Sequence, residues 1–179
     1  MSDEAAAERG RPEAEESGSA AEGGVIDRLG IDISDAAARG AGLETDFWRP
    51  QLTRLKEVLE KRERRGAVLV GPRGVGKRAV AFALAAAIRN GEVPPHLRNR
   101  RVVELPFHRV LAGARQAGDF ERVTFMALRE AACRDDVVLF LNQIPSFMGA
   151  GAGAKGLFDA SYAIEMACHQ PGLFLVGSA

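Results

Sequence analysis

The residues best suited to chemistry lie in one short glycine-rich segment. Its members are Gly71, Pro72, Arg73, Gly74, Val75, Gly76, Lys77 and Arg78. Glycines at this spacing let the backbone close around a phosphate group, a following helix adds N–H donors, and Lys77 adds a positive charge. This pattern usually ends in Ser or Thr, whose hydroxyl holds Mg²⁺, but Arg78 takes that place here. A guanidinium has no acceptor atom, so the segment predicts a phosphate site without its usual metal ligand.

Alternating strands and helices are expected to position this segment. The apolar patterns predict strands over 67–70, 101–105, 136–141 and 173–177, and helices over 49–65, 79–90, 119–133 and 157–168. Three of the four strands are unbroken apolar runs, which is typical of a parallel sheet covered by helices on both faces. The predicted fold class is therefore α/β, with three layers and a parallel sheet. Residues 25–43 are expected to lie along the surface without forming an element.

The composition indicates one α/β core, at 25–179, behind a disordered acidic tail at 1–24. The tail carries seven acidic and two basic residues and is rich in Ala, Glu, Gly and Ser. The formal net charge of the whole chain is zero, which gives no reason to expect nucleic acid or an acidic membrane as a partner. The basic run at 98–101 is expected to form a solvated face.

The remaining composition favours a cytoplasmic location. No apolar run approaches the ~20 residues of a membrane span, and the N-terminus lacks the pattern of a secretory signal. Cys133 and Cys168 are the only cysteines, and the three histidines have no ligand spacing. No metal site is expected from these residues.

Further segments at 90–94, 111–115, 118–121 and 149–161 extend the pattern around the glycine-rich loop. Together, and in this order, they resemble the first ATPase module of the Clp family of AAA+ unfoldases and chaperones. The resemblance implies a P-loop fold that binds ATP or ADP at 71–78. It also implies that the last strand, the arginine finger and the helical lid of that module would lie beyond Ala179.

The resemblance also marks positions where the family's catalytic residues are replaced. The third strand of the family ends in an Asp-Glu pair that organises Mg²⁺ and orients water, and here these positions are Asn142 and Gln143. An amide cannot act as a general base. Gln116 stands where the pore loop has an aromatic residue, and Ala179 where the family has a polar sensor. The resemblance therefore implies a pseudo-ATPase with no catalytic residue and no metal ligand at these positions.

Several residues have two interpretations on sequence alone. The loop at 71–77 is either a phosphate site or a structural turn, and Lys77 favours the first. Arg78 either replaces the charge of Mg²⁺ or, more simply, extends into solvent. Asn142 and Gln143 reflect either binding without hydrolysis or decay. The Phe47-Trp48 pair either stacks on an adenine ring or, as is commoner, packs beneath a helix.

Two functions remain open as well. The first is a nucleotide-binding pseudo-ATPase that acts in or beside a Clp-type assembly. The second is a non-nucleotide interaction or adaptor module for a AAA+ partner, and a fragment of a larger Clp ATPase is a further alternative. The resemblance implies the strand order of AAA+ modules without their last strand. This order would place the strand at 67–70 at the edge of the sheet, where it would favour self-association or docking onto a Clp-type protein.

Overall fold

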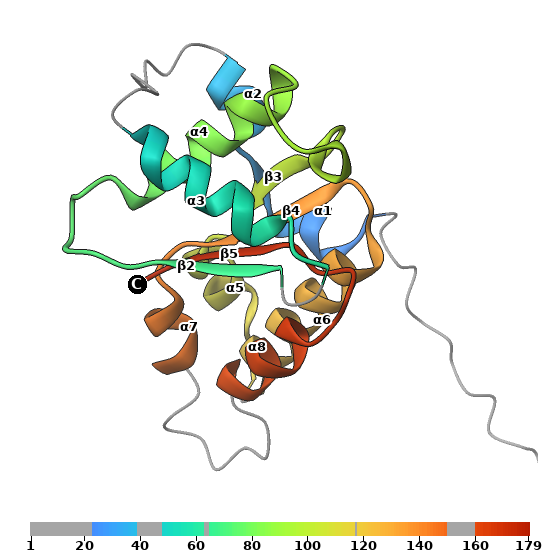
Figure 1. Cartoon of the computed structure of the whole chain (residues 1–179). Coiled ribbons are helices and arrows are strands. Elements are labelled where there is room, and N and C mark those ends of the chain that lie inside the picture. The colour runs from blue at the N-terminus through green and yellow to red at the C-terminus, as the bar shows by residue number, and fades with distance from the viewer. Residues whose placement is uncertain (1–22, 39–47, 63–64, 117, 150–159) are drawn as a thin grey trace, which may run out of the picture.

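Five strands form one sheet in the computed structural model, which describes residues 23–38, 48–62, 65–116, 118–149 and 160–179 (Figure 1). The strand order is β1-β3-β4-β5-β2. The strands are β1 (Ile31–Asp32), β2 (Gly66–Leu69), β3 (Arg101–Glu104), β4 (Val137–Leu141) and β5 (Leu175–Ser178). The last four run parallel to one another, and β1 pairs antiparallel with β3. The predicted α/β class is confirmed, and β2 lies at the edge of the sheet as expected, but the sheet is mostly rather than wholly parallel.

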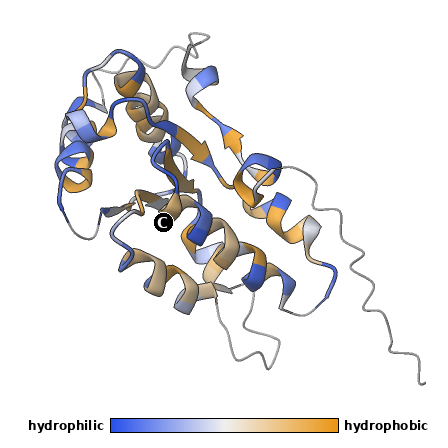
Figure 2. Cartoon of the chain, turned by 90° about the vertical axis from the view of Figure 1, so that its right-hand side faces the viewer, coloured by the Kyte–Doolittle hydropathy of each residue, from blue (hydrophilic) through white to orange (hydrophobic). Residues whose placement is uncertain are grey.

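Helices cover both faces of this sheet (Figure 1). One face carries α2 (Ser34–Ala38), α3 (Arg49–Leu59), α4 (Lys77–Arg89) and the 3₁₀ turn η2 (Pro95–Leu97), and the other carries α5 (Phe107–Gly113), α6 (Asp119–Cys133), α7 (Ile144–Gly149) and α8 (Ala160–Cys168). Successive side chains of β4 alternate between the two faces, so Val138 packs beneath α3 and α4, whereas Leu139 packs against α6 and α8. This alternation fills both cores, and the strands accordingly appear as an apolar centre in Figure 2.

The predicted elements recur with small shifts at their ends. Helix α6 begins and ends at the predicted residues, whereas α3 stops at Leu59, short of the predicted end at 65. Of the predicted helix over 157–168, residues 157–159 lie outside the described residues, as do residues 1–22 of the acidic tail. The Ala-rich helix α4 is buried on several sides, because its small side chains allow close packing against the sheet and α2.

The prediction that residues 25–43 form no element of their own is wrong. Residues 25–38 form α1 (Val25–Leu29), β1 and α2. Ile26 and Ile33 are each only 1% exposed, so the segment contributes to both cores instead of lying on the surface. Short elements of two to five residues carry too little periodicity to be recognised from sequence.

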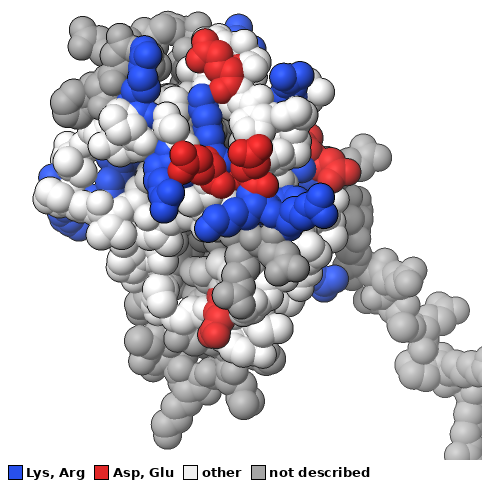
Figure 3. Space-filling view, in the orientation of Figure 1, with Lys and Arg blue, Asp and Glu red and all other residues white. Residues whose placement is uncertain are grey.

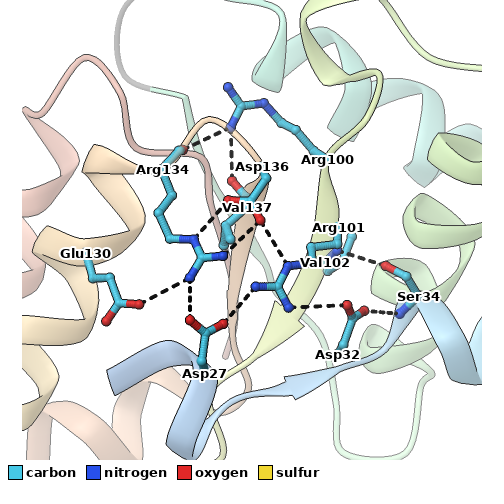
Figure 4. A network of polar contacts seen from close by, with 10 residues as sticks. All are labelled: Asp27, Asp32, Ser34, Arg100, Arg101, Val102, Glu130, Arg134, Asp136 and Val137. Carbon is cyan, nitrogen blue, oxygen red and sulfur yellow. Dashed lines mark hydrogen bonds and ion pairs between the residues drawn. The ribbon is translucent and has the colours of Figure 1, made fainter. Parts of the chain in front are cut away.

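A network of ion pairs fastens this N-terminal segment to the sheet (Figure 4). Asp27 on α1 receives hydrogen bonds from Arg101 (2.9 Å) and Arg134 (2.8 Å). Both arginines also bind Asp136, and Arg134 does so through two nitrogens at 2.9 Å each. Glu130 on α6 accepts the backbone N–H of Ile26 at 3.2 Å. These contacts join α1, β3 and the turn between α6 and β4, three parts of the chain that are distant in sequence.

The network shifts the titration of its acids. Hydrogen bonds from Arg101 and Arg134 hold the pKa of the Asp27 carboxyl below its ordinary value. The hydrogen bonds from Arg134 likewise hold the pKa of Asp136 far below its usual range. A carboxyl with a lowered folded-state pKa contributes stability above its unfolded pKa of about 3.9 and loses it as the pH falls through the folded value.

We therefore expect Asp27→Asn to lower the free energy of unfolding at pH 7 by about 1 kcal/mol, since the carboxylate is partly exposed. This difference from the unaltered protein should shrink as the pH falls below about 4, where Asp27 is protonated first in the unfolded state and then, below its lowered pKa, in the folded state as well. Urea denaturation between pH 7 and pH 2.5 measures it. Glu165→Gln, at an exposed position on α8, is the control and should show no comparable pH dependence. A constant Asp27→Asn difference over this range would contradict the assignment.

Candidate functional site

The carboxyl ends of the four parallel strands lie at one end of the sheet, and the glycine-rich loop lies there as well. Glu104 ends β3, Asn142 directly follows β4, and Ser178 ends β5. In the register of the sheet, Leu69 of β2 pairs with Ser178, and the loop begins two residues later. Ligands of parallel α/β sheets bind at the carboxyl ends of the strands, because loops and helix N-termini converge there. The structure thus brings the predicted loop residues and Asn142 to one place.

The loop has the backbone shape that its glycines permit. Gly74 and Gly76 have φ angles of +80° and +93°, which a side chain would disfavour. A Cβ atom on Gly76 would also lie 2.3 Å from the ring of Trp48. The loop closes through a hydrogen bond from the N–H of Val75 to the carbonyl of Pro72 (3.3 Å). Glycine at position 76 is therefore required by both the conformation and the space available.

Lys77 places its charge within this loop. Lys77 is the first residue of α4. Its Nζ reaches back to the loop and donates to the carbonyl oxygens of Gly71 (2.5 Å) and Pro72 (3.0 Å). The first turn of α4 adds backbone N–H groups and the positive end of the helix dipole. A cationic side chain and helix N–H donors at one point form an arrangement suited to an anion.

Trp48 packs as the commoner of the two sequence interpretations predicts. It immediately precedes α3, is partly buried, and contacts the core beneath α3 and α4. The same ring lies against Gly76 and so supports the loop from below. Phe47, the other member of the pair, lies outside the described residues.

Arg78 forms an ion pair that neither sequence interpretation anticipated. Its Nη2 lies 2.6 Å and its Nε 3.0 Å from one carboxylate oxygen of Glu104. Because Arg78 is held by this ion pair, the expectation that it extends freely into solvent is wrong. Its side chain is 50% exposed, and the side chain of Glu104 is only 6% exposed. The buried charge of Glu104 must be compensated, which draws the guanidinium toward the end of β3.

Asn142 and Ser178 extend this pair into a network across three strands. The Nδ2 of Asn142 donates to the other carboxylate oxygen of Glu104 (3.2 Å), and its Oδ1 accepts from the Ser178 hydroxyl (2.9 Å). The Ser178 oxygen in turn accepts the backbone N–H of Gln143 at 2.9 Å. Gln143 has a φ of +65° and an exposed side chain, so the network uses its backbone N–H.

Sequence reasoning missed Glu104 and Ser178. Glu104 carried one usable signal, because it is the single acid within an otherwise apolar run that follows Arg101. A charged residue in such a strand needs a partner, and an arginine at an unusual loop position was available. Ser178 carried no signal, since a lone serine near a strand end is common.

These residues do not fit a Mg²⁺ ion. Mg²⁺ requires oxygen ligands in near-octahedral geometry, normally including carboxylates. Glu104 supplies the one carboxylate of the network, and both of its oxygens are already bonded to Arg78 and Asn142. Asn142 offers a neutral amide, whose oxygen is bonded to Ser178. The guanidinium of Arg78 would also repel a cation beside it.

The basic run at 98–101 is only in part a solvated face, which corrects that expectation. Arg98 is exposed, but the guanidinium of Arg100 lies 3.9 Å from the centre of the Phe174 ring and donates to the carbonyl of Val137. Arg101 belongs to the network around Asp27. On the face shown in Figure 3, acidic and basic side chains are mixed and no field of a single sign extends across it.

Comparisons with known proteins identify similar modules. No family model matches the chain. It is 36% identical over 155 residues to the ATP-dependent Clp protease ATP-binding subunit ClpC of Staphylococcus aureus, strains USA300 and N315. This match covers 86% of the chain and 19% of ClpC, so the chain spans about a fifth of the length of these relatives.

The solved structures give the same result for the fold. An Hsp104–ADP complex of S. cerevisiae has a TM-score of 0.72 at 25% identity and covers 86% of this chain and 26% of its own. A closed-state reconstruction of Hsp104 with ATPγS and casein has a TM-score of 0.72 at 26% identity, with coverage of 87% and 26%. The chain is thus homologous to a AAA+ module of ClpC and Hsp104 over most of its length. None of the described helices is long and apolar enough to cross a membrane.

We expect Arg78→Ala to lower the free energy of unfolding by about 1–3 kcal/mol, because it leaves the buried carboxylate of Glu104 without its cationic partner. Combining it with Glu104→Gln should recover part of that loss, since the glutamine is neutral and still accepts from Asn142. Urea denaturation of the two single variants and the double variant measures this coupling. Arg89→Ala, at the exposed end of the same helix, is the control and should change stability by less than about 0.5 kcal/mol. Strict additivity of the two substitutions would show that the pair is not coupled.

Proposed function

We propose that this chain is a Clp-like nucleotide-binding module that holds ATP or ADP at residues 71–78 and hydrolyses it little or not at all. The observation that carries the proposal is the placement of Lys77, whose ammonium lies within the loop at the start of α4. The ammonium bonds two carbonyls of the loop, and a phosphate bound in the same loop would offer it a stronger, charged acceptor. The Staphylococcus aureus relatives are named as ATP-binding subunits, which supports the same ligand class.

The inferred lack of hydrolysis follows from the groups at the carboxyl end of the sheet. Phosphoryl transfer relies on positioned cations and on a residue that orients or deprotonates water. An amide at Asn142 or Gln143 cannot accept a proton from water. The carboxylate of Glu104 is buried and bonded to Arg78 and Asn142, so it is not placed to act as a base. We infer binding without turnover, in or beside a Clp-type assembly that remodels proteins.

The β2 edge supports a second candidate function, as an interaction module. Among the described residues, β2 pairs with β5 alone. Val68 within β2 is 53% exposed, and Val70 directly after it is 81% exposed. A shallow hollow runs along this edge and is lined by Val68, Ile164 and Cys168, among others. An apolar, unpaired strand edge favours pairing with another chain. We therefore propose self-association or docking onto a Clp-type partner through β2.

For nucleotide binding, Lys77→Ala should abolish the stabilisation that ATP or ADP gives the unaltered protein. Ligand at 100 times its Kd should raise the free energy of unfolding by ~2.7 kcal/mol. Thermal unfolding with and without nucleotide measures the effect, and phosphate release is followed in the same samples. We expect release far below the ~1–100 s⁻¹ of related phosphoryl transferases.

The matched control for this experiment is Lys61→Ala, an exposed lysine outside the loop, which should keep the full shift. If neither nucleotide shifts the unaltered protein, the nucleotide function fails and the interaction module becomes the better explanation. Turnover within the ordinary range would refute the inference that hydrolysis is lost.

For the β2 edge, we expect the unaltered protein to form dimers or larger species at micromolar concentration, or to bind a Clp-type ring. Val68→Lys combined with Val70→Lys should weaken this association at least tenfold, because charges oppose strand pairing at an edge. Size-exclusion chromatography with light scattering measures it. Met126→Lys, an exposed apolar position on α6, is the control. This second candidate would be refuted if the unaltered protein is monomeric and does not bind a Clp-type ring.

A further inference from the structure

The ion pair between Arg78 and Glu104 presents its positive end outward. The side chain of Arg78 is 50% exposed, whereas that of Glu104 is 6% exposed. Only Nε and Nη2 bond to Glu104, and within the described part of the chain Nη1 makes no hydrogen bond or ion pair. The two N–H donors of Nη1 therefore have no acceptor among the described residues.

The guanidinium is also held in a defined orientation. Glu104 binds it on one side, and its carbon lies 5.0 Å from the centre of the Phe82 ring, one turn further along α4. Arg78 directly follows Lys77 in the first turn of this helix, where N–H groups and the dipole favour an anion. A cation whose orientation is fixed before the ligand arrives loses little entropy on binding.

The same residues exclude the divalent ion that nucleotide sites of this type usually use. The oxygens that would ligate it are bonded within the network, and the guanidinium lies beside them. We propose that the loop binds nucleotide phosphate without a divalent cation. Arg78, held by Glu104, supplies oriented N–H donors in place of that cation, and Lys77 supplies the net positive charge that the Arg78–Glu104 pair does not carry. This inference rests on the proposed nucleotide function and specifies the form of the ligand, which is the metal-free nucleotide.

The charges of the ligand give the proposal a direct consequence. Mg²⁺ in solution neutralises part of the phosphate charge and occupies oxygens that Lys77 and Arg78 would otherwise contact. A site that uses only protein cations should therefore bind the metal-free nucleotide at least as tightly as the magnesium complex. A site that uses the metal shows the opposite order.

The first test uses the unaltered protein. Titration calorimetry with ATP and with ADP, each in excess Mg²⁺ and in EDTA, should give affinities within about twofold, or tighter binding in EDTA. A fall of tenfold or more in EDTA would overturn this inference while leaving the nucleotide function in place. Absence of binding in both buffers would refute the proposed function and, with it, this inference.

The second test uses Arg78→Thr, which removes the guanidinium. Loss of this charge-assisted contact to phosphate should weaken binding in EDTA about tenfold or more. Arg78→Lys retains a positive charge and should lose less, and Arg89→Thr on the exposed end of α4 should lose nothing. Circular dichroism of each variant confirms folding before titration. Unchanged affinity of a folded Arg78→Thr variant would overturn the role of Arg78.

Discussion

The carboxylate of Glu104 imposes the constraint on which the arrangement at the carboxyl end of the sheet depends. A charge that is almost fully removed from water is costly unless it is paired and hydrogen-bonded. Arg78 and Asn142 satisfy it, and Asn142 is in turn tied to Ser178. One requirement thus connects α4 to β3, β4 and β5 at the carboxyl end of the sheet, where the nucleotide is proposed to bind. The same bonds occupy the oxygens that a metal ion would need as ligands.

The two edges of the sheet differ in how they are protected. At one edge, β1 pairs antiparallel with β3, and the network around Asp27 and Arg101 fastens it there. At the other, Val68 and Val70 are exposed and carry no charge that would discourage pairing. The glycine-rich loop follows this second edge directly in the chain. A partner that paired with β2 would therefore also constrain the strand that leads into the phosphate site, which would couple the two proposed functions physically.

Features encoded locally could be predicted from the sequence. Continuous apolar runs such as β4 and the periodic pattern of α6 identified the α/β class, and the spacing of the glycines identified the loop. The missed features depend on partners that are remote in sequence. Arg78 and Glu104 are 26 residues apart, and the bonds of Asn142 and Ser178 span more than 35 residues. Residue types restrict what such groups can do, but only the register of the strands shows which of them meet. The arginines at 100 and 101 illustrate the same limit, because their acceptors and the Phe174 ring come from other elements.

The completeness of this network bears on the proposed loss of hydrolysis. Random loss of catalytic groups would be expected to leave buried polar atoms without partners, since each substitution removes one side of an existing contact. Instead, Arg78, Glu104, Asn142 and Ser178 bond to one another, and among the described side chains the single buried polar atom without a partner is the Thr124 hydroxyl, on α6. A closed set of contacts that depends on an arginine and a buried acid is a specific alternative structure. Under the proposed function, it favours a site that binds without hydrolysis over one that has decayed.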